Sequence, residues 1–212
     1  MRYRFHEELK SLNDELLTMC SMVEKAIDRS VKALYDGDVA TAKTIMVQDD
    51  DIDKEQTVIQ QMCFDLLMTQ QPVASDLRFV SAASNMVRDM ERIGDHAADI
   101  AEITTLIQGT HYQSNLRSIR KMADATTDML RNGILAFIDR DEKLAKNVIK
   151  YDDVVDGLFL EAKNEVIGRI RKDEEIGEEA ADLLMVAKYF ERIGDHAVNI
   201  AEDLIFAVEN HR

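Results

Sequence analysis

Apolar side chains follow one another at steps of three and four through the first part of the chain, the spacing that gathers them on one face of an α-helix. They are Leu9, Leu12, Leu16, Met19, Val23, Ile27, Val31 and Leu34. The pattern stops at Asp36-Gly37-Asp38, a run of turn-forming residues. We therefore expect a first long helix that ends near residue 36 and faces a core.

The same spacing predicts a second helix from Val39 to about Thr69, ending where Gln70-Gln71-Pro72 prevents a helix from continuing. Its apolar positions are Ala42, Ile45, Met46, Ile52, Ile59, Met62 and Leu66.

A third helix is expected to begin with Ser75 or Asp76 as its cap and to run to about Thr105, before a break at residues 109–113. Three long helices joined by short turns predict one antiparallel bundle.

The second half of the chain repeats the first. The segment ERIGDHAADIAE at residues 91–102 returns as ERIGDHAVNIAE at residues 191–202, and the segment that begins at Leu34 lines up with the one that begins at Phe137. Aspartates recur in the matching places, pairing Asp36 with Asp139, Asp38 with Asp141, Asp49 with Asp152, Asp50 with Asp153 and Asp53 with Asp156.

The first half carries a few extra residues around TQQPVASD, where the second half has RKDEEIGEEA, and we expect this insertion to lie in a loop. The predicted fold is all-α: two tandem three-helix bundles, six long antiparallel helices with an internal pseudo-two-fold repeat. The first bundle is expected to cover residues 1–110 and the second residues 111–212.

Composition narrows the possible functions. The chain has 41 acidic and 26 basic residues, a formal charge of −15, which repels nucleic acid and anionic lipid at long range. No apolar run reaches the ~18 residues that span a bilayer, and the first residues lack the apolar centre of a signal peptide, so we expect a cytoplasmic protein. Cys20 and Cys63 show no metal-ligand spacing and are expected to be buried free thiols.

The repeated segment places acidic side chains on one side of the third helix of each half, opposite Ile93, Ala97 and Ile100. The stripe is Glu91, Asp95 and Asp99 in the first copy, and Glu191, Asp195 and Asn199 in the second. A solvated helix face shows the same arrangement, and Arg88 and Lys188 can offset part of its charge. Acids four residues apart nevertheless repel when no cation separates them.

The second helix of each half carries acids at the same spacing, Asp49 with Asp53 and Asp152 with Asp156. If the stripes of neighbouring helices meet, four or more carboxylates converge, and such a group is stable mainly with a bound multivalent cation. Ligands that are all oxygen favour hard ions such as iron(III), manganese, magnesium or calcium.

His96 and His196 follow the acids but lie off the acidic line, so a hydrogen-bonding or interface role is as good a hypothesis as a metal-ligand role. Gly94 and Gly194 indicate close approach of another backbone or a ligand, or a tight helix crossing. The sequence shows no nucleophile elbow, phosphate-binding glycine loop or E-x-x-H pair, so no enzyme activity is expected.

The two copies of ERIGDHA, the segment QPVASDLR at residues 71–78 and the segment MVEKAI at residues 22–27 together resemble the PhoU family of phosphate-uptake regulators. The resemblance extends over nearly the whole chain and includes the order of the motifs. QPVASDLR has no counterpart in the second half, so any role that it has belongs to one bundle.

The resemblance implies a non-enzymatic negative regulator of phosphate uptake and phosphate-starvation signalling. It would act as an adaptor between the phosphate ABC transporter and a sensor histidine kinase, peripheral to the inner face of the membrane through protein partners, and as a homodimer. It also implies metal ions, iron foremost, at the acidic motifs. Those residues would be Asp49, Asp53, Glu91 and Asp95 in the first bundle and Asp152, Asp156, Glu191 and Asp195 in the second, with Asp99 assisting and Asn199 in its place in the second copy.

Two other functions remain open at this point. A helical carboxylate protein could store or buffer metal, in which case the acids would be its whole function. A PhoU-like protein could also serve a different phosphate or ion transporter.

Overall fold

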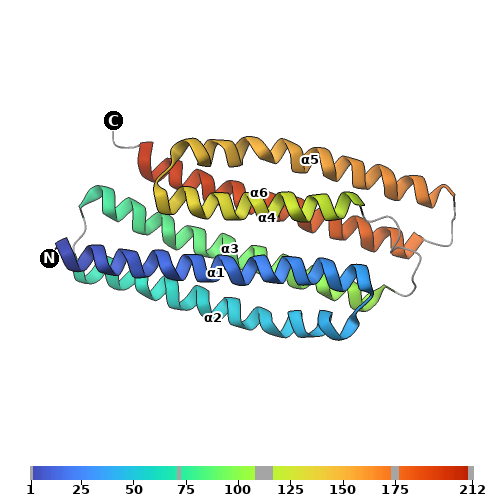
Figure 1. Cartoon of the computed structure of the whole chain (residues 1–212), viewed down its shortest axis with the longest axis horizontal. Coiled ribbons are helices and arrows are strands. Elements are labelled where there is room, and N and C mark those ends of the chain that lie inside the picture. The colour runs from blue at the N-terminus through green and yellow to red at the C-terminus, as the bar shows by residue number, and fades with distance from the viewer. Residues whose placement is uncertain (1, 71–72, 108–116, 173–176, 210–212) are drawn as a thin grey trace.

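The computed structural model describes residues 2–70, 73–107, 117–172 and 177–209. It contains six helices in this part of the chain and no strand. They are α1 (Arg2–Asp36), α2 (Val39–Gln70), α3 (Ala74–Leu106), α4 (Arg117–Asp139), α5 (Glu142–Ile170) and α6 (Gly177–Glu209). All six run roughly along one long axis (Figure 1). The all-α prediction of two tandem three-helix bundles is confirmed, whereas the expected boundary at residues 110 and 111 lies outside the described residues.

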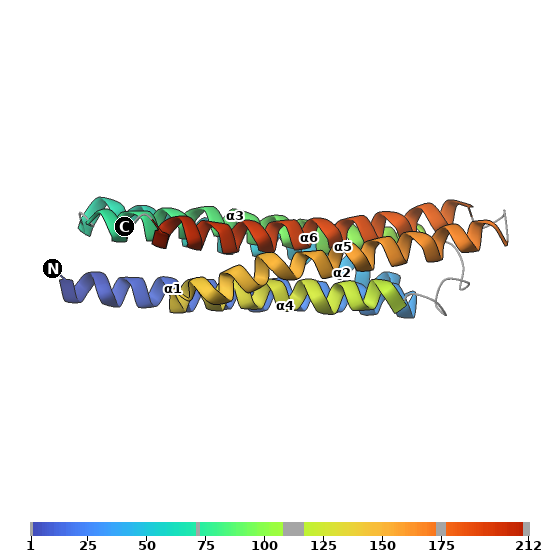
Figure 2. The ribbon, with the colours of Figure 1, turned by 90° about the horizontal axis from the view of Figure 1, so that it is seen from above.

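Each half is a bundle in which every helix packs on the other two. In the first half these are α1, α2 and α3, and in the second half α4, α5 and α6. The halves join through two helix pairs, α3 with α6 and α1 with α4. Figure 2 shows these pairs as two layers, with α3 and α6 on one side of the molecule and α1 and α4 on the other.

One continuous apolar core extends through both bundles. Phe79 of α3 stacks on Phe137 of α4 with ring centroids 4.2 Å apart, so a fully buried ring of the second half is covered by a ring of the first. Arg131 of α4 pairs with Glu24 of α1 at 2.8 Å on the surface of the same junction. The halves therefore share their interior.

The repeated aspartates Asp38 and Asp141 begin α2 and α5. Asp38 accepts hydrogen bonds from the backbone N–H and the hydroxyl of Thr41, and Asp141 accepts from the backbone N–H groups of Lys143 and Leu144. Side-chain acceptors at this position satisfy amides that have no partner within the helix. Just before them, Gly37 and Arg140 both adopt positive φ angles of 63° and 55°. The turn geometry is thus repeated along with the motifs.

One sequence expectation about α3 was wrong. Ser75 and Asp76 do not cap it: the helix begins at Ala74, and Val73 occupies the cap position without a side-chain hydrogen bond. Val73 is exposed, so water can satisfy the first amides. The loop expected to hold the extra residues of the first half includes residues 71–72, which lie outside the described residues, as do residues 173–176 of the second half. In the described part of the chain, α2 extends about one turn further past Asp53 than α5 does past Asp156.

Cys20 and Cys63 are buried free thiols, as expected. Burial raises the pKa of each to about 12, because a thiolate would lose its hydration in the core.

Candidate metal centre

The antiparallel packing of α2 on α3 brings acids from both helices to one place in the first half. One carboxylate oxygen each from Asp53, Glu91 and Asp95 lies within 4.8 Å of the other two. Asp53 is exposed, and the other two are half-buried. The structure thus confirms that the stripes of neighbouring helices meet, and we call Asp49, Asp53, Glu91 and Asp95 the first acid cluster.

Asp49 lies deeper than Asp53 because α3 carries a glycine opposite it. A Cβ built on Gly94 would stand 3.4 Å from Oδ1 of Asp49 and 3.0 Å from Cδ1 of Ile52. A Cβ built on Gly194 would stand 3.1 Å from Oδ1 of Asp152 in the same way. Each glycine therefore admits the side chains of the neighbouring helix, an aspartate among them. The sequence predicted close approach of another backbone or a ligand, or a tight helix crossing, whereas the atoms nearest each glycine belong to side chains of the neighbouring helix.

The acids are close enough to oppose one another's ionisation. Burial, followed by the charges of Asp95, Asp53 and Glu91, raises the pKa of Asp49 to about 6. Burial and the charge of Asp95 raise the pKa of Glu91 as well. Partly desolvated carboxylates that face one another favour a proton or a cation between them.

The negative charge of the first acid cluster is partly offset by Arg92, and not by Arg88 as the sequence indicated. Arg92 donates to Oδ2 of Asp95 at 2.9 Å and lies 3.5 Å from Oε2 of Glu91. Arg88 bonds to Asn85 instead, at 3.4 Å. Arg92 is exposed, and one guanidinium against four carboxylates leaves an excess of negative charge.

The corresponding acids of the second half form a looser group. Burial and then Asp156, Asp195 and Glu191 raise the pKa of Asp152 to about 6, so these four side chains also face one another. Lys188 pairs with Glu191, as the sequence indicated. Within the described residues, however, three ligand atoms of the second half do not come within 4.8 Å of one another.

Asp99 and Asn199 are directed elsewhere, into the seam between α3 and α6. Asp99 lies with Oδ2 3.3 Å from Nδ1 of His96, and Asn199 donates to Oδ1 of Asp89 at 3.0 Å. Nδ1 of His196 lies 2.7 Å from the same oxygen of Asp89. The residues that the sequence placed on one acidic stripe thus divide between two sites, and a metal-ligand role for Asp99 and Asn199 stays a prediction.

The histidines confirm the interface interpretation. The rings of His96 and His196 lie 5.6 Å apart across the seam, and the ring of Tyr189 lies 5.4 Å from His96. Asp89 belongs to none of the predicted site residues, yet its Oδ1 atom contacts both His196 and Asn199. Only the packing of α6 on α3 gives it that role.

The donor set of the first acid cluster fits a hard cation. Every candidate ligand is a carboxylate oxygen, three of them already converge, and their mutual repulsion is not cancelled by Arg92. Manganese, magnesium, calcium and iron(III) take such ligands, whereas zinc and copper(I) prefer nitrogen and sulfur.

Known proteins match the chain over nearly its full length. The family model described as the PhoU domain matches twice, at residues 16–104 and 119–204. A protein of Clostridium acetobutylicum named "Phosphate-specific transport system accessory protein PhoU homolog" is 35% identical over 205 residues, which are 96% of this chain and 94% of that protein. A homologue of the same name from Pseudomonas aeruginosa is 32% identical and covers 97% of this chain and 85% of its own length.

Two crystal structures of other proteins superpose closely on this chain. The crystal structure of PhoU from Pseudomonas aeruginosa superposes with a TM-score of 0.89 at 32% identity, covering 97% of this chain and 99% of that one. The phosphate transport system regulatory protein PhoU from Streptococcus pneumoniae gives a TM-score of 0.88 at 28% identity, covering 98% of both chains.

Proposed function

Because the chain belongs to the PhoU family, we propose that it regulates phosphate uptake as an accessory protein of a phosphate-specific transport system. The observation that carries this proposal is the full-length match to proteins that bear that name, in both halves of the repeat. The finer role is that of a negative regulator without enzymatic activity, which links the phosphate ABC transporter to a sensor histidine kinase and works as a homodimer.

A hard metal ion at the first acid cluster is the second part of the proposal. Asp53, Glu91 and Asp95 would hold it, with Asp49 as a further ligand, and a looser counterpart would form in the second half. A bound cation supplies positive charge that removes the repulsion among these acids and ties α2 to α3. The ligand set suits hard ions in general, and iron is the ion that the family resemblance implies, with manganese, magnesium and calcium as alternatives.

Recruitment to the membrane would depend on protein partners. A chain of formal charge −15 is repelled by anionic lipid, and bound cations weaken that field only locally. No helix in the described part of the chain has the length and apolar character needed to cross a bilayer.

Deleting the gene in its host and measuring phosphate uptake in phosphate-rich medium tests the regulatory role. We expect higher uptake and higher expression of phosphate-starvation genes, and full-length protein supplied from a plasmid should restore both. Unchanged uptake and expression would contradict the proposal.

The same assay tests the need for metal. The variant Asp53→Asn, Glu91→Gln, Asp95→Asn should restore regulation poorly. A matched control with three exposed acids neutralised, Glu7→Gln, Asp14→Asn, Glu178→Gln, loses the same charge and should restore it fully. Equal restoration by both would remove the acid cluster from the regulatory mechanism.

A further inference from the structure

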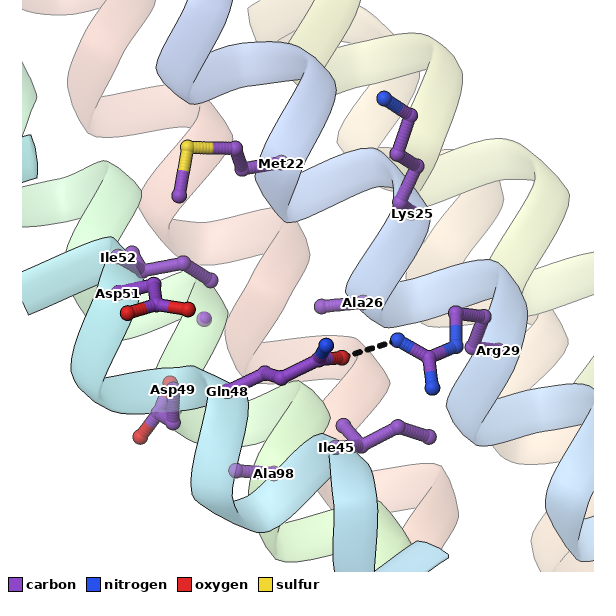
Figure 3. A pocket seen from close by; sticks show the side chains of 11 residues that line it. Met22, Lys25, Ala26, Arg29, Ile45, Gln48, Asp49, Asp51, Ile52 and Ala98 are labelled. Carbon is purple, nitrogen blue, oxygen red and sulfur yellow. Dashed lines mark hydrogen bonds between the residues drawn. The ribbon is translucent and has the colours of Figure 1, made fainter. Parts of the chain in front are cut away.

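The first bundle contains a pocket beside its acid cluster, and Asp49 belongs to both. The pocket has a volume of about 230 Å³ and lies between α1, α2 and α3 (Figure 3). Three of its lining residues, Met22, Lys25 and Ala26, belong to the segment MVEKAI, to which the metal centre gives no role. The pocket interrupts the core of the bundle: Ile52 on one side belongs to the main core, and Ile45 on the other belongs to a separate small cluster.

The floor of the pocket is apolar and built from small side chains. Met22, Ile45 and Ile52 form its walls, while Ala26 of α1 and Ala98 of α3 leave the space open. Apolar surface of this kind, with a few polar groups at its rim, is typical of small-molecule sites.

The polar groups at the rim include two cations on α1. Arg29 reaches across to α2 and donates to Oε1 of Gln48, and Lys25 extends from the rim one turn away (Figure 3). Among the described residues, neither Arg29 nor Lys25 has a carboxylate within ion-pair distance.

The two acids of the lining are already engaged. Asp51 accepts from Lys54 at 2.8 Å, and Asp49 faces the first acid cluster. Arg29 keeps N–H groups that Gln48 does not use, and the amide of Gln48 can donate beside them. A guanidinium with free donors binds carboxylate and phosphate oxygens with two parallel hydrogen bonds.

The internal repeat shows what the same fold looks like without this pocket. In the register that pairs Asp49 with Asp152, Ala26 corresponds to Met129 and Arg29 to Asn132. Met129 is fully buried, and Ala125 stands where the first half has Met22, so the second half places its long and short side chains differently. In the register of the repeated segment, Ala98 corresponds to the larger Val198. The fold therefore does not require the small residues or the arginine, and their presence in the first half needs another reason.

We propose that this pocket binds a small organic anion, a carboxylate or a phosphate monoester with an apolar body. Arg29 and Gln48 hold the anionic group, Lys25 adds positive charge at the rim, and the apolar body lies over Ala26 and Ala98. This site adjoins the metal centre, with which it shares Asp49, and it does not depend on the phosphate-transport role.

Titration with 8-anilinonaphthalene-1-sulfonate, an anionic dye with an apolar body, tests the proposal on full-length, chelator-treated protein, so that a failure of the metal proposal does not affect the result. We expect saturable binding to the wild type. Arg29→Asn should weaken it about tenfold, because it removes a charged hydrogen-bond donor. Ala26→Met with Ala98→Val, which copies the second half, should abolish it while leaving all charges in place.

Arg171→Asn removes the same charge from an exposed position in the second half and is expected to change the dye affinity less than twofold. Thermal melting of each variant checks that it is folded. If the variant Ala26→Met with Ala98→Val does not fold, Arg29→Asn alone tests the proposal. Dye affinity unchanged in Arg29→Asn, or equally weakened in Arg171→Asn, would overturn the proposal.

Competition then identifies the anionic group. Phenyl phosphate and benzoate carry the same apolar body with different anions, and the one that displaces the dye at lower concentration identifies the class of ligand. Displacement by neither would overturn the claim that the pocket takes small organic anions.

Discussion

Asp49 lies against Gly94, so that a Cβ at residue 94 would stand 3.4 Å from its Oδ1 atom and 3.0 Å from Cδ1 of Ile52. We expect Gly94→Ala to destabilise the protein by about 1 kcal/mol, because displacing these side chains costs more than the gain in helix propensity. Gly157→Ala is the matched control, since a Cβ there meets nothing within 4 Å, and it should stabilise by about 0.5 to 1 kcal/mol. Urea unfolding measures both. Equal stabilisation by the two would show that residue 94 has room for a Cβ.

The raised pKa of Asp49 predicts how stability depends on pH in metal-free protein. Its pKa is about 6 in the folded state against 3.8 ordinarily, so the folded protein holds an extra proton between about pH 4 and pH 6. The stability supplied by that proton is complete below pH 4 and is lost as the pH rises through 6. We therefore expect Asp49→Asn to stabilise by about 1 kcal/mol at pH 8, after allowance for solvent screening, and by little at pH 4.

Urea unfolding of wild type and Asp49→Asn at both pH values, with chelator present, measures this effect. Asp14→Asn is a suitable control, because this exposed residue lies on α1 and is not among the charges that raise the pKa of Asp49. If Asp49→Asn is less stable than the wild type at pH 8, the negative charge of Asp49 must be stabilised by its neighbours in the folded protein.

The cap at Asp141 should contribute measurably to stability. Asp141→Ala leaves the N–H groups of Lys143 and Leu144 without their side-chain acceptor and should cost about 1 kcal/mol. Asp141→Asn keeps an acceptor at the same place and should cost much less. Thermal unfolding measures the loss of stability in each variant. Equal losses in Asp141→Ala and Asp141→Asn would show that the charge of Asp141, and not its hydrogen bonds, stabilises the helix.

The stacked pair Phe79 and Phe137 should make the two halves unfold together. Phe79→Ala is expected to cost about 3 to 5 kcal/mol, because it opens a cavity in the shared core. A double-mutant cycle with Phe137→Leu should give a coupling of about 0.5 to 1.5 kcal/mol. Urea unfolding should remain a single transition in the wild type. Two separate transitions would mean that the halves fold independently.

Much of the fold could be predicted from the sequence, because helix ends and the internal repeat can be recognised in it without knowledge of tertiary contacts. Asp36-Gly37-Asp38 ends α1 where expected, and the repeated segments predicted the second bundle. The start of α3 was misplaced, because an exposed helix end can be solvated by water and does not need the polar caps at Ser75 or Asp76.

The candidate site was less predictable, because it depends on which helix lies on which face. The wheel of α3 grouped Asp99 with Asp95, but Asp99 lies beside His96 of the same helix, and the ring of His96 faces Tyr189 and His196 of α6 across the seam. Arg92, by contrast, pairs with Asp95 at the i, i+3 spacing of a helical ion pair, so its place beside the cluster is a local feature of α3. No pattern within one helix indicates where a second bundle will pack.

Manganese binding to chelator-treated protein, followed by electron paramagnetic resonance, tests the metal centre most directly. We expect a small fixed number of manganese sites. The tightest site should be lost in the triple variant Asp53→Asn, Glu91→Gln, Asp95→Asn. It should be kept in the triple control variant Glu7→Gln, Asp14→Asn, Glu178→Gln. The corresponding second-half variant, Asp156→Asn, Glu191→Gln, Asp195→Asn, should leave that tightest site in place. Unchanged binding in the first-half variant would contradict a metal site at this cluster.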